Sequence, residues 1–166
     1  MGIKNEGKKG FTIIEVVLVL AIAGLIFMMV FIALPALQKG QRDTQRKNDL
    51  SRLQTAVTQY TSNNRGNLPS NWDDFEKQYL IGSDDGAFID PLGETTATEV
   101  NPIDGYSLQQ NSGDLNGVFN EDTQNVIYYA VDSKCSTGGA IEGNAGSRKV
   151  AFRIYLEGGG VACQNN

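Results

Sequence analysis

The stretch GFTIIEVVLVLAIAGLIFMMVFIALPAL, residues 10–37, decides the fold of this chain. No charged residue occurs over the 22 positions from Val16 to Leu37. At about 1.5 Å per residue, a helix over this run would be roughly 33 Å long, which is enough to cross the hydrocarbon core of a bilayer. A secretory signal has a shorter apolar region, of roughly 7–15 residues. The stretch therefore predicts a membrane-spanning helix near the N-terminus.

The helix is expected to continue beyond the apolar run. Residues 38–49 are mostly polar helix formers. Four apolar residues then recur at steps of three, four and three, which is the spacing of one buried helix face: Leu50, Leu53, Val57 and Tyr60. Asn63, Asn64 and Gly66 provide a stop signal. We predict one helix from about residue 12 to about residue 62, bent at Pro35, which cannot donate a backbone hydrogen bond.

The rest of the chain predicts a small sheet. NVIYYAV (125–131) and KVAFRIYL (149–156) are rich in β-branched and aromatic residues, and the second alternates apolar and polar as an antiparallel strand with one wet face does. Further strands are expected near 106–109 and 161–163. Because the apolar face of such a sheet needs a cover, we expect it to pack on the helix face of residues 50–60. The predicted fold class is α+β.

Between helix and sheet, a short helix is expected over residues 72–79, capped by Ser70 or Asn71. Its aromatic residues, Trp72, Phe75 and Tyr79, are interpreted as core in preference to a ligand platform. The oxygen-rich stretch at 114–122 differs in spacing from an EF-hand calcium loop, so it is interpreted as a plain polar loop.

Charge and composition exclude several classes of function. Residues 1–52 carry eight basic and four acidic side chains, a net +4, and residues 53–166 carry six and fifteen, a net −9. An acidic globular part argues against direct binding of nucleic acid. The chain contains no histidine and no sequence signature of an enzyme, so neither catalysis, a cofactor nor a metal is predicted.

Two features leave alternatives open. Cys135 and Cys163 form either a disulfide, as an exported domain would permit, or a pair of buried thiols. The basic residues beyond the apolar run either face acidic patches on neighbouring subunits or form a solvated helix surface. These residues are Lys39, Arg42, Arg46, Lys47 and Arg52.

The junction KKGFTIIE, residues 8–15, resembles the leader and N-terminus of type IV pilins and their relatives. The resemblance covers residues 8–37 and, more loosely, the helix to residue 62. It implies that a membrane peptidase cuts between Gly10 and Phe11 and methylates the new amine of Phe11. It also implies that Glu15 pairs with the terminal amine of a neighbouring subunit; the alternative is a carboxylate at the lipid interface. Gly24 and Pro35 would bracket a segment that loses helix in filaments; the alternative is that they are ordinary residues of a membrane helix, where Gly and Pro are common.

The resemblance implies four regions: a leader (1–10), an apolar membrane and assembly helix (11–37), its amphipathic continuation (38–62) and a globular head (63–166). The expected partners are other copies of the chain, the prepilin peptidase and methyltransferase, the pilus assembly machinery and the membrane before assembly. The head would lie outside the cell and the N-terminus inside. The expected function is that of a filament subunit. The alternatives are a minor pilin or pseudopilin for secretion or DNA uptake, and a single-pass anchored binding domain that does not polymerise.

Overall fold

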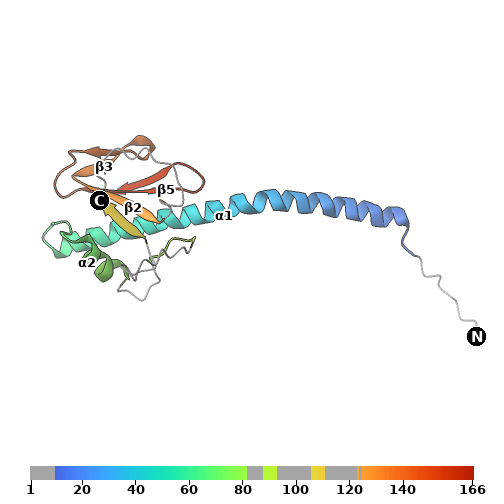
Figure 1. Cartoon of the computed structure of the whole chain (residues 1–166), viewed down its shortest axis with the longest axis horizontal. Helices are drawn as coiled ribbons and strands as arrows, with labels where there is room; N and C mark the ends of the chain where they lie inside the picture. The colour runs from blue at the N-terminus through green and yellow to red at the C-terminus, as the bar shows by residue number, and fades with distance from the viewer. Residues whose placement is uncertain (1–9, 82–87, 93–105, 111–122, 124) are drawn as a thin grey trace, which may run out of the picture. The chain divides into compact units, whose positions relative to one another are not determined.

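A computed structural model describes residues 10–81, 88–92, 106–110, 123 and 125–166 (Figure 1). By its internal contacts the chain divides into two compact units, Met1–Gln38 and Lys39–Asn166. The first contains the apolar half of the long helix. The second contains the remainder of that helix together with the sheet.

The long helix α1 runs from Ile13 to Asn63, which confirms the predicted extent. Pro35 lies inside it, and the helix continues past this residue. Its C-terminal end follows from left-handed backbone at Arg65 (φ 57°) and Gly66 (φ 84°), and the Gly66 N–H donates to the Thr61 carbonyl at 2.6 Å. Glycine adopts this conformation without a steric cost, which explains the stop signal.

The main sheet has four strands in the order β1-β2-β5-β6. Their bounds are Ser107–Gln110 (β1), Val126–Val131 (β2), Val150–Tyr155 (β5) and Val161–Asn165 (β6). The β2–β5 and β5–β6 pairs are antiparallel, as predicted. β1, however, pairs with β2 in parallel, so the sheet is mixed at this edge. The α+β class is confirmed.

The core lies between α1 and this sheet. Leu50, Leu53 and Val57 are fully buried and belong to one apolar cluster with the sheet residues Ile127 and Phe152. Burial of each such side chain is worth about 1.5–3 kcal/mol. The predicted cover of the sheet by this helix face is therefore confirmed.

The short helix α2 (Trp72–Glu76) is followed by one π-helical turn, η1 (Lys77–Ile81). Asn71 is its N-cap, since its side-chain oxygen accepts from the N–H groups of Asp73 and Asp74. Trp72 is 9% exposed, and its ring lies 4.3 Å from that of Tyr129 on the sheet. The interpretation as core is confirmed for Trp72 and Phe75, and Tyr79 is half-buried and packs against this core.

The prediction of a wet face on β5 is wrong. All six residues of the strand are buried, including Arg153, which is 6% exposed. A hairpin of β3 (Ser133–Cys135) and β4 (Ile141–Gly143) contributes to this burial because β3 lies against both β5 and β6. Arg153 also donates to the Tyr155 hydroxyl at 3.3 Å, so the polar positions of the alternating pattern form a buried layer of their own.

Candidate functional site

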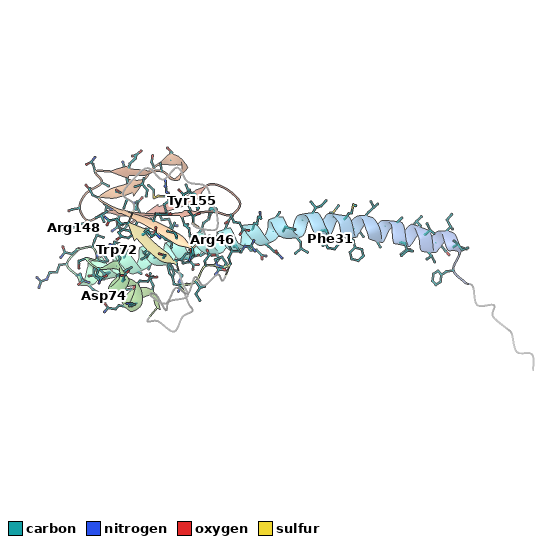
Figure 2. All side chains as sticks on the ribbon, viewed as in Figure 1. Phe31, Arg46, Trp72, Asp74, Arg148 and Tyr155 are labelled. Carbon is teal, nitrogen blue, oxygen red and sulfur yellow. A yellow bond between two sulfur atoms is a disulfide. The ribbon has the colours of Figure 1, made fainter. Side chains whose placement is uncertain are left out.

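The apolar half of α1 is exposed to its surroundings along its length. Phe11 is 90% exposed, and Phe31, which Figure 2 shows pointing away from the helix, is 77% exposed. The helix is long and apolar enough to cross a membrane. A continuous apolar surface of this extent is unfavourable in water.

Glu15 closes the N-terminal end of this helix. Its carboxylate accepts from the Thr12 N–H and from the Thr12 hydroxyl, both at 2.8 Å, and the Glu15 N–H donates to the Thr12 hydroxyl at 3.4 Å. This reciprocal pattern is a capping box. Its sequence signature, Thr-x-x-Glu over residues 12–15, was available but was not used in our prediction.

The structure describes some of the residues predicted for leader cleavage and for loss of helix. Gly10 is exposed and precedes the helix, whereas residues 1–9 of the predicted leader lie outside the described residues. Gly24 and Pro35 are both helical. A Cβ added to Gly24 would meet nothing within 4 Å, so the packing of the single chain does not require a glycine there. Loss of helix in an assembled state stays a prediction.

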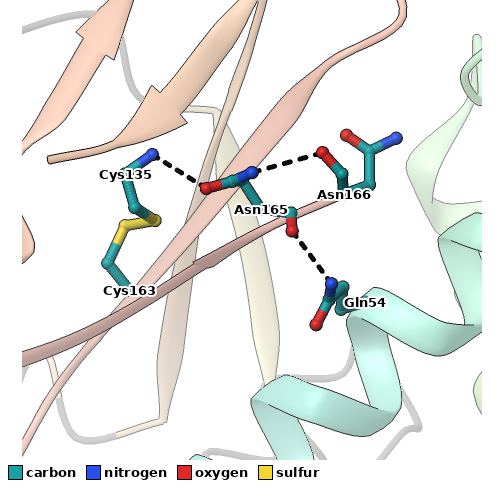
Figure 3. Close-up of a disulfide and its surroundings, with 5 residues drawn as sticks. All are labelled: Gln54, Cys135, Cys163, Asn165 and Asn166. Carbon is teal, nitrogen blue, oxygen red and sulfur yellow. Dashed lines mark hydrogen bonds between the residues drawn. A yellow bond between two sulfur atoms is a disulfide. The ribbon is translucent and has the colours of Figure 1, made fainter.

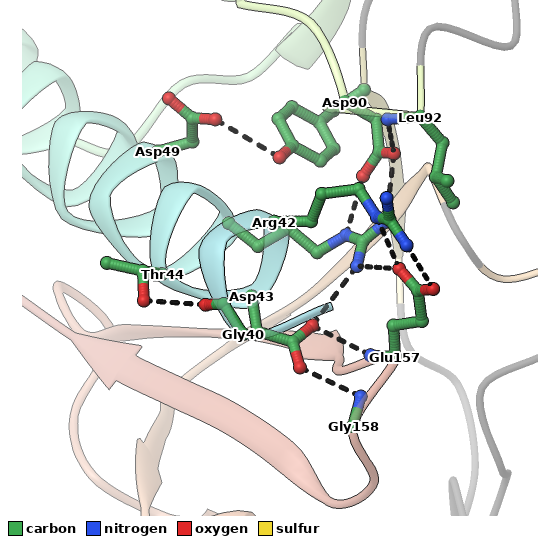
Figure 4. Close-up of polar contacts among 11 residues, drawn as sticks. Gly40, Arg42, Asp43, Thr44, Asp49, Asp90, Leu92, Glu157 and Gly158 are labelled. Atoms are coloured by element: carbon green, nitrogen blue, oxygen red, sulfur yellow. Dashed lines mark hydrogen bonds and ion pairs between the residues drawn. The ribbon is translucent and has the colours of Figure 1, made fainter. Parts of the chain in front are cut away.

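In the second unit, α1 carries a buried cluster of charges around Arg46. Figure 4 labels its other members Arg42, Asp43, Asp90 and Glu157. The Arg46 guanidinium makes two hydrogen bonds to the Asp90 carboxylate, at 2.7 and 2.9 Å, and one to Asp43 at 3.1 Å. The Arg46 side chain is completely buried. Two parallel hydrogen bonds between arginine and a carboxylate fix geometry as well as charge. Arg46 therefore holds the segment 88–92 against α1.

The same cluster holds the turn between β5 and β6. Asp43 accepts from the backbone N–H groups of Glu157 and Gly158, both at 2.8 Å, and Arg42 donates from Nε to Glu157 at 2.7 Å. These hydrogen bonds from Arg42 lower the pKa of the Glu157 carboxyl. A Cβ at Gly158 would lie 2.9 Å from the Asp43 carboxylate, so a side chain there would displace this carboxylate from its hydrogen bonds to the turn.

Both interpretations of the basic residues beyond the apolar run are therefore wrong for Arg46, whose side chain is fully buried in its own chain, and Arg42 also has a carboxylate partner within the chain. Arg46 binds Asp43, three residues away, and Asp90, 44 residues away, and Arg42 binds Glu157, 115 residues away. The spacing contained the signal for Arg46, because it precedes Leu50 by four residues and so continues the buried helix face. The identity of its partner could not be obtained from spacing.

Cys135 and Cys163 form a disulfide between β3 and β6, with their Cα atoms 5.8 Å apart (Figure 3). Beside it, the Cys135 N–H donates to the Asn165 side chain at 3.2 Å, and Gln54 of α1 donates to the Asn165 carbonyl at 2.9 Å. The C-terminal strand is thus attached to the hairpin covalently and to α1 by a hydrogen bond.

The described part of the chain contains no group of three or more residues of the types His, Cys, Asp and Glu that could hold a metal ion. The oxygen-rich stretch 114–122 lies outside the described residues. What the described geometry offers is an exposed apolar helix, and a head whose turns and strands are attached to the continuation of that helix.

Comparison with known proteins gives one partial match. The family model of the MucBP domain matches residues 77–129, less than a third of the chain. No curated protein and no solved structure matches this sequence. The fold defines an α+β protein with one helix of membrane-spanning length, and the comparisons assign it to no family.

Proposed function

We propose that this chain is the precursor of a type IV pilin-like filament subunit, cut after Gly10 and polymerised through the apolar half of α1. The motif at residues 8–15 supports the proposal, and the exposure of Gly10 and Phe11 is compatible with access by a peptidase. The precursor would span the cytoplasmic membrane with its head outside, and the mature subunit would join a surface filament.

The observation that carries the proposal is the exposed apolar surface of residues 11–37, where Phe11, Phe31 and their neighbours find no cover within the described chain. Burial at about 25 cal/mol per Å² would favour either lipid or packing against other helices of the same kind. An assembly route from membrane to filament core uses both environments in turn.

Glu15 has a defined part in this route. In the single chain its carboxylate receives two hydrogen bonds from Thr12. Cleavage creates a positively charged amine at Phe11, and the amine of a neighbouring subunit would offer Glu15 a partner of opposite charge. In a dry core such a pair sets the register of neighbours more than it adds stability.

Mass spectrometry of protein sheared from the cell surface tests the proposal. We expect a chain that begins at Phe11 and carries one added methyl group. An intact N-terminus found only in membranes, with nothing in the sheared fraction, would refute it.

The role of Glu15 needs a separate comparison. We expect Glu15→Leu to abolish filaments while the precursor still accumulates in the membrane. Thr12→Val is the matched control, because it removes the hydroxyl from the capping box and leaves the carboxylate available. If both variants impaired assembly equally, capping rather than pairing would be the function of Glu15.

A second candidate is a membrane-anchored binding domain that does not polymerise. It is favoured by the match to the MucBP, or mucus-binding, domain over residues 77–129. The shearing experiment separates the two candidates, because an anchored domain stays with the membrane fraction.

A further inference from the structure

A groove of about 450 Å³ lies between α1 and η1 in the second unit. Small-molecule sites commonly enclose roughly 300–1,000 Å³. Its described lining comes from Ser51, Arg52, Thr55, Ala56 and Gln59 on α1, and from Tyr79 and Leu80 on η1. All of the described lining residues belong to the second unit.

The groove has an apolar floor. Ala56 and Leu80 are 6% and 3% exposed and belong to the core cluster. The Tyr79 ring stacks on Phe75 with centroids 5.4 Å apart, and its hydroxyl accepts from Asn63 at 3.4 Å. These contacts fix the ring in place, so a ligand that uses it loses little side-chain entropy.

The rim of the groove is polar, and hydrogen bonds to helix carbonyls already orient two of its hydroxyl groups. The Ser51 hydroxyl donates to the Lys47 carbonyl at 3.0 Å, and the Thr55 hydroxyl donates to the Ser51 carbonyl at 2.9 Å. The Ser51 oxygen in turn accepts from the Gln164 amide at 2.9 Å, whereas the Thr55 oxygen presents acceptor lone pairs to the groove. The exposed Gln59 amide can both donate and accept.

The groove has no net preference for a charged ligand. Arg52 is the only charged residue in the described lining, and its guanidinium is already paired with the Asp49 carboxylate at 3.2 Å. An anionic ligand would compete with Asp49, and a cationic one would meet no carboxylate among the described lining residues. This favours an uncharged ligand.

We propose that this groove binds an uncharged oligosaccharide. A pyranose ring has a face of C–H groups, which matches the floor at Ala56 and Leu80, and a rim of hydroxyl groups. Each of those hydroxyls both donates and accepts, which matches the acceptor at Thr55 and the amide of Gln59. The inference goes beyond the proposed function and holds for a filament subunit and an anchored domain alike.

The test uses the full chain in detergent micelles and immobilised oligosaccharides of galactose and N-acetylhexosamines, with sialylated and sulfated versions in parallel. We expect binding to the uncharged set. Thr55→Arg, which places a long side chain across the groove, should lower affinity by about tenfold or more. Gln59→Ala should lower it to a smaller extent.

Thr58→Arg is the matched control, because it adds the same charge to the same helix. Thr58 is exposed and is not among the lining residues of the groove. It should bind like the unmodified chain. The proposal is overturned if no uncharged oligosaccharide binds, if only the acidic versions bind, or if the Thr55 and Thr58 variants behave alike. The emission of Trp72 checks that each variant is folded.

Discussion

Replacing Arg46 by methionine should destabilise the head severely. The substitution keeps an unbranched stem and a similar helix propensity, and it removes the guanidinium group with its charge. It leaves the Asp90 carboxylate, 4% exposed, without the two hydrogen bonds that Arg46 supplies. Asp43 is affected less, since it keeps two backbone N–H groups.

The magnitude follows from this burial. Removing one partner of a buried ion pair typically costs about 3–5 kcal/mol, because the other charge stays desolvated. A small domain has a total stability of about 5–15 kcal/mol, so the loss is a large share of it. We expect about 3–5 kcal/mol for Arg46→Met.

The assay is urea denaturation of the full chain in micelles, followed by the fluorescence of Trp72, which is the only tryptophan and lies in the core. Arg42→Met is the control. Arg42 contacts Glu157, but its side chain is 25% exposed. The loss of stability in Arg42→Met should therefore be clearly smaller than in Arg46→Met.

A double substitution, Arg46→Met with Asp90→Asn, tests the cause. Asparagine removes the buried charge and keeps an oxygen that can accept from the Leu92 N–H, as Asp90 does at 2.9 Å. We expect the double variant to recover at least half of the loss. A single variant within about 1 kcal/mol of the unmodified chain, or a double variant no more stable than the single one, would refute the reasoning.

Three further predictions concern the head. Burial, with a smaller contribution from Asp73, raises the pKa of Glu76 from 4.5 to about 7. The folded state therefore holds a proton that the unfolded chain has lost, so stability should fall as the pH rises from 4.5 to 7, by about 3 kcal/mol at 1.4 kcal/mol per pH unit. Glu76→Gln should remove this dependence and be the more stable form at pH 7.5; equal denaturation midpoints at pH 5 and 7.5 in the unmodified chain would contradict it. Breaking the Cys135–Cys163 disulfide, which closes a separation of 28 residues, should cost about 3–4 kcal/mol by loop entropy, and calorimetry of the double serine variant measures it. Asn71→Ala removes the cap of α2 and should cost about 1 kcal/mol in the same experiment, whereas Ser70→Ala should have little effect.

The sequence alone determined the elements with a strong local signal. The charge-free run from Val16 to Leu37 and the spacing from Leu50 to Tyr60 gave α1 to within one residue at each end, because helix periodicity and solvent preference act over neighbouring residues. The cap at Asn71 and the β-branched runs of β2 and β5 are local in the same sense.

Tertiary structure decided what depends on distant residues. Only the folded chain shows that Arg46 meets Asp90, that Arg42 meets Glu157, and that β1 lies parallel to β2. Only the fold buries both faces of β5. A single sequence does not specify which of several carboxylates or strands will be brought together from separate parts of the chain. That choice is made by the packing of the whole head, where a buried arginine is stable only beside the charges that compensate it.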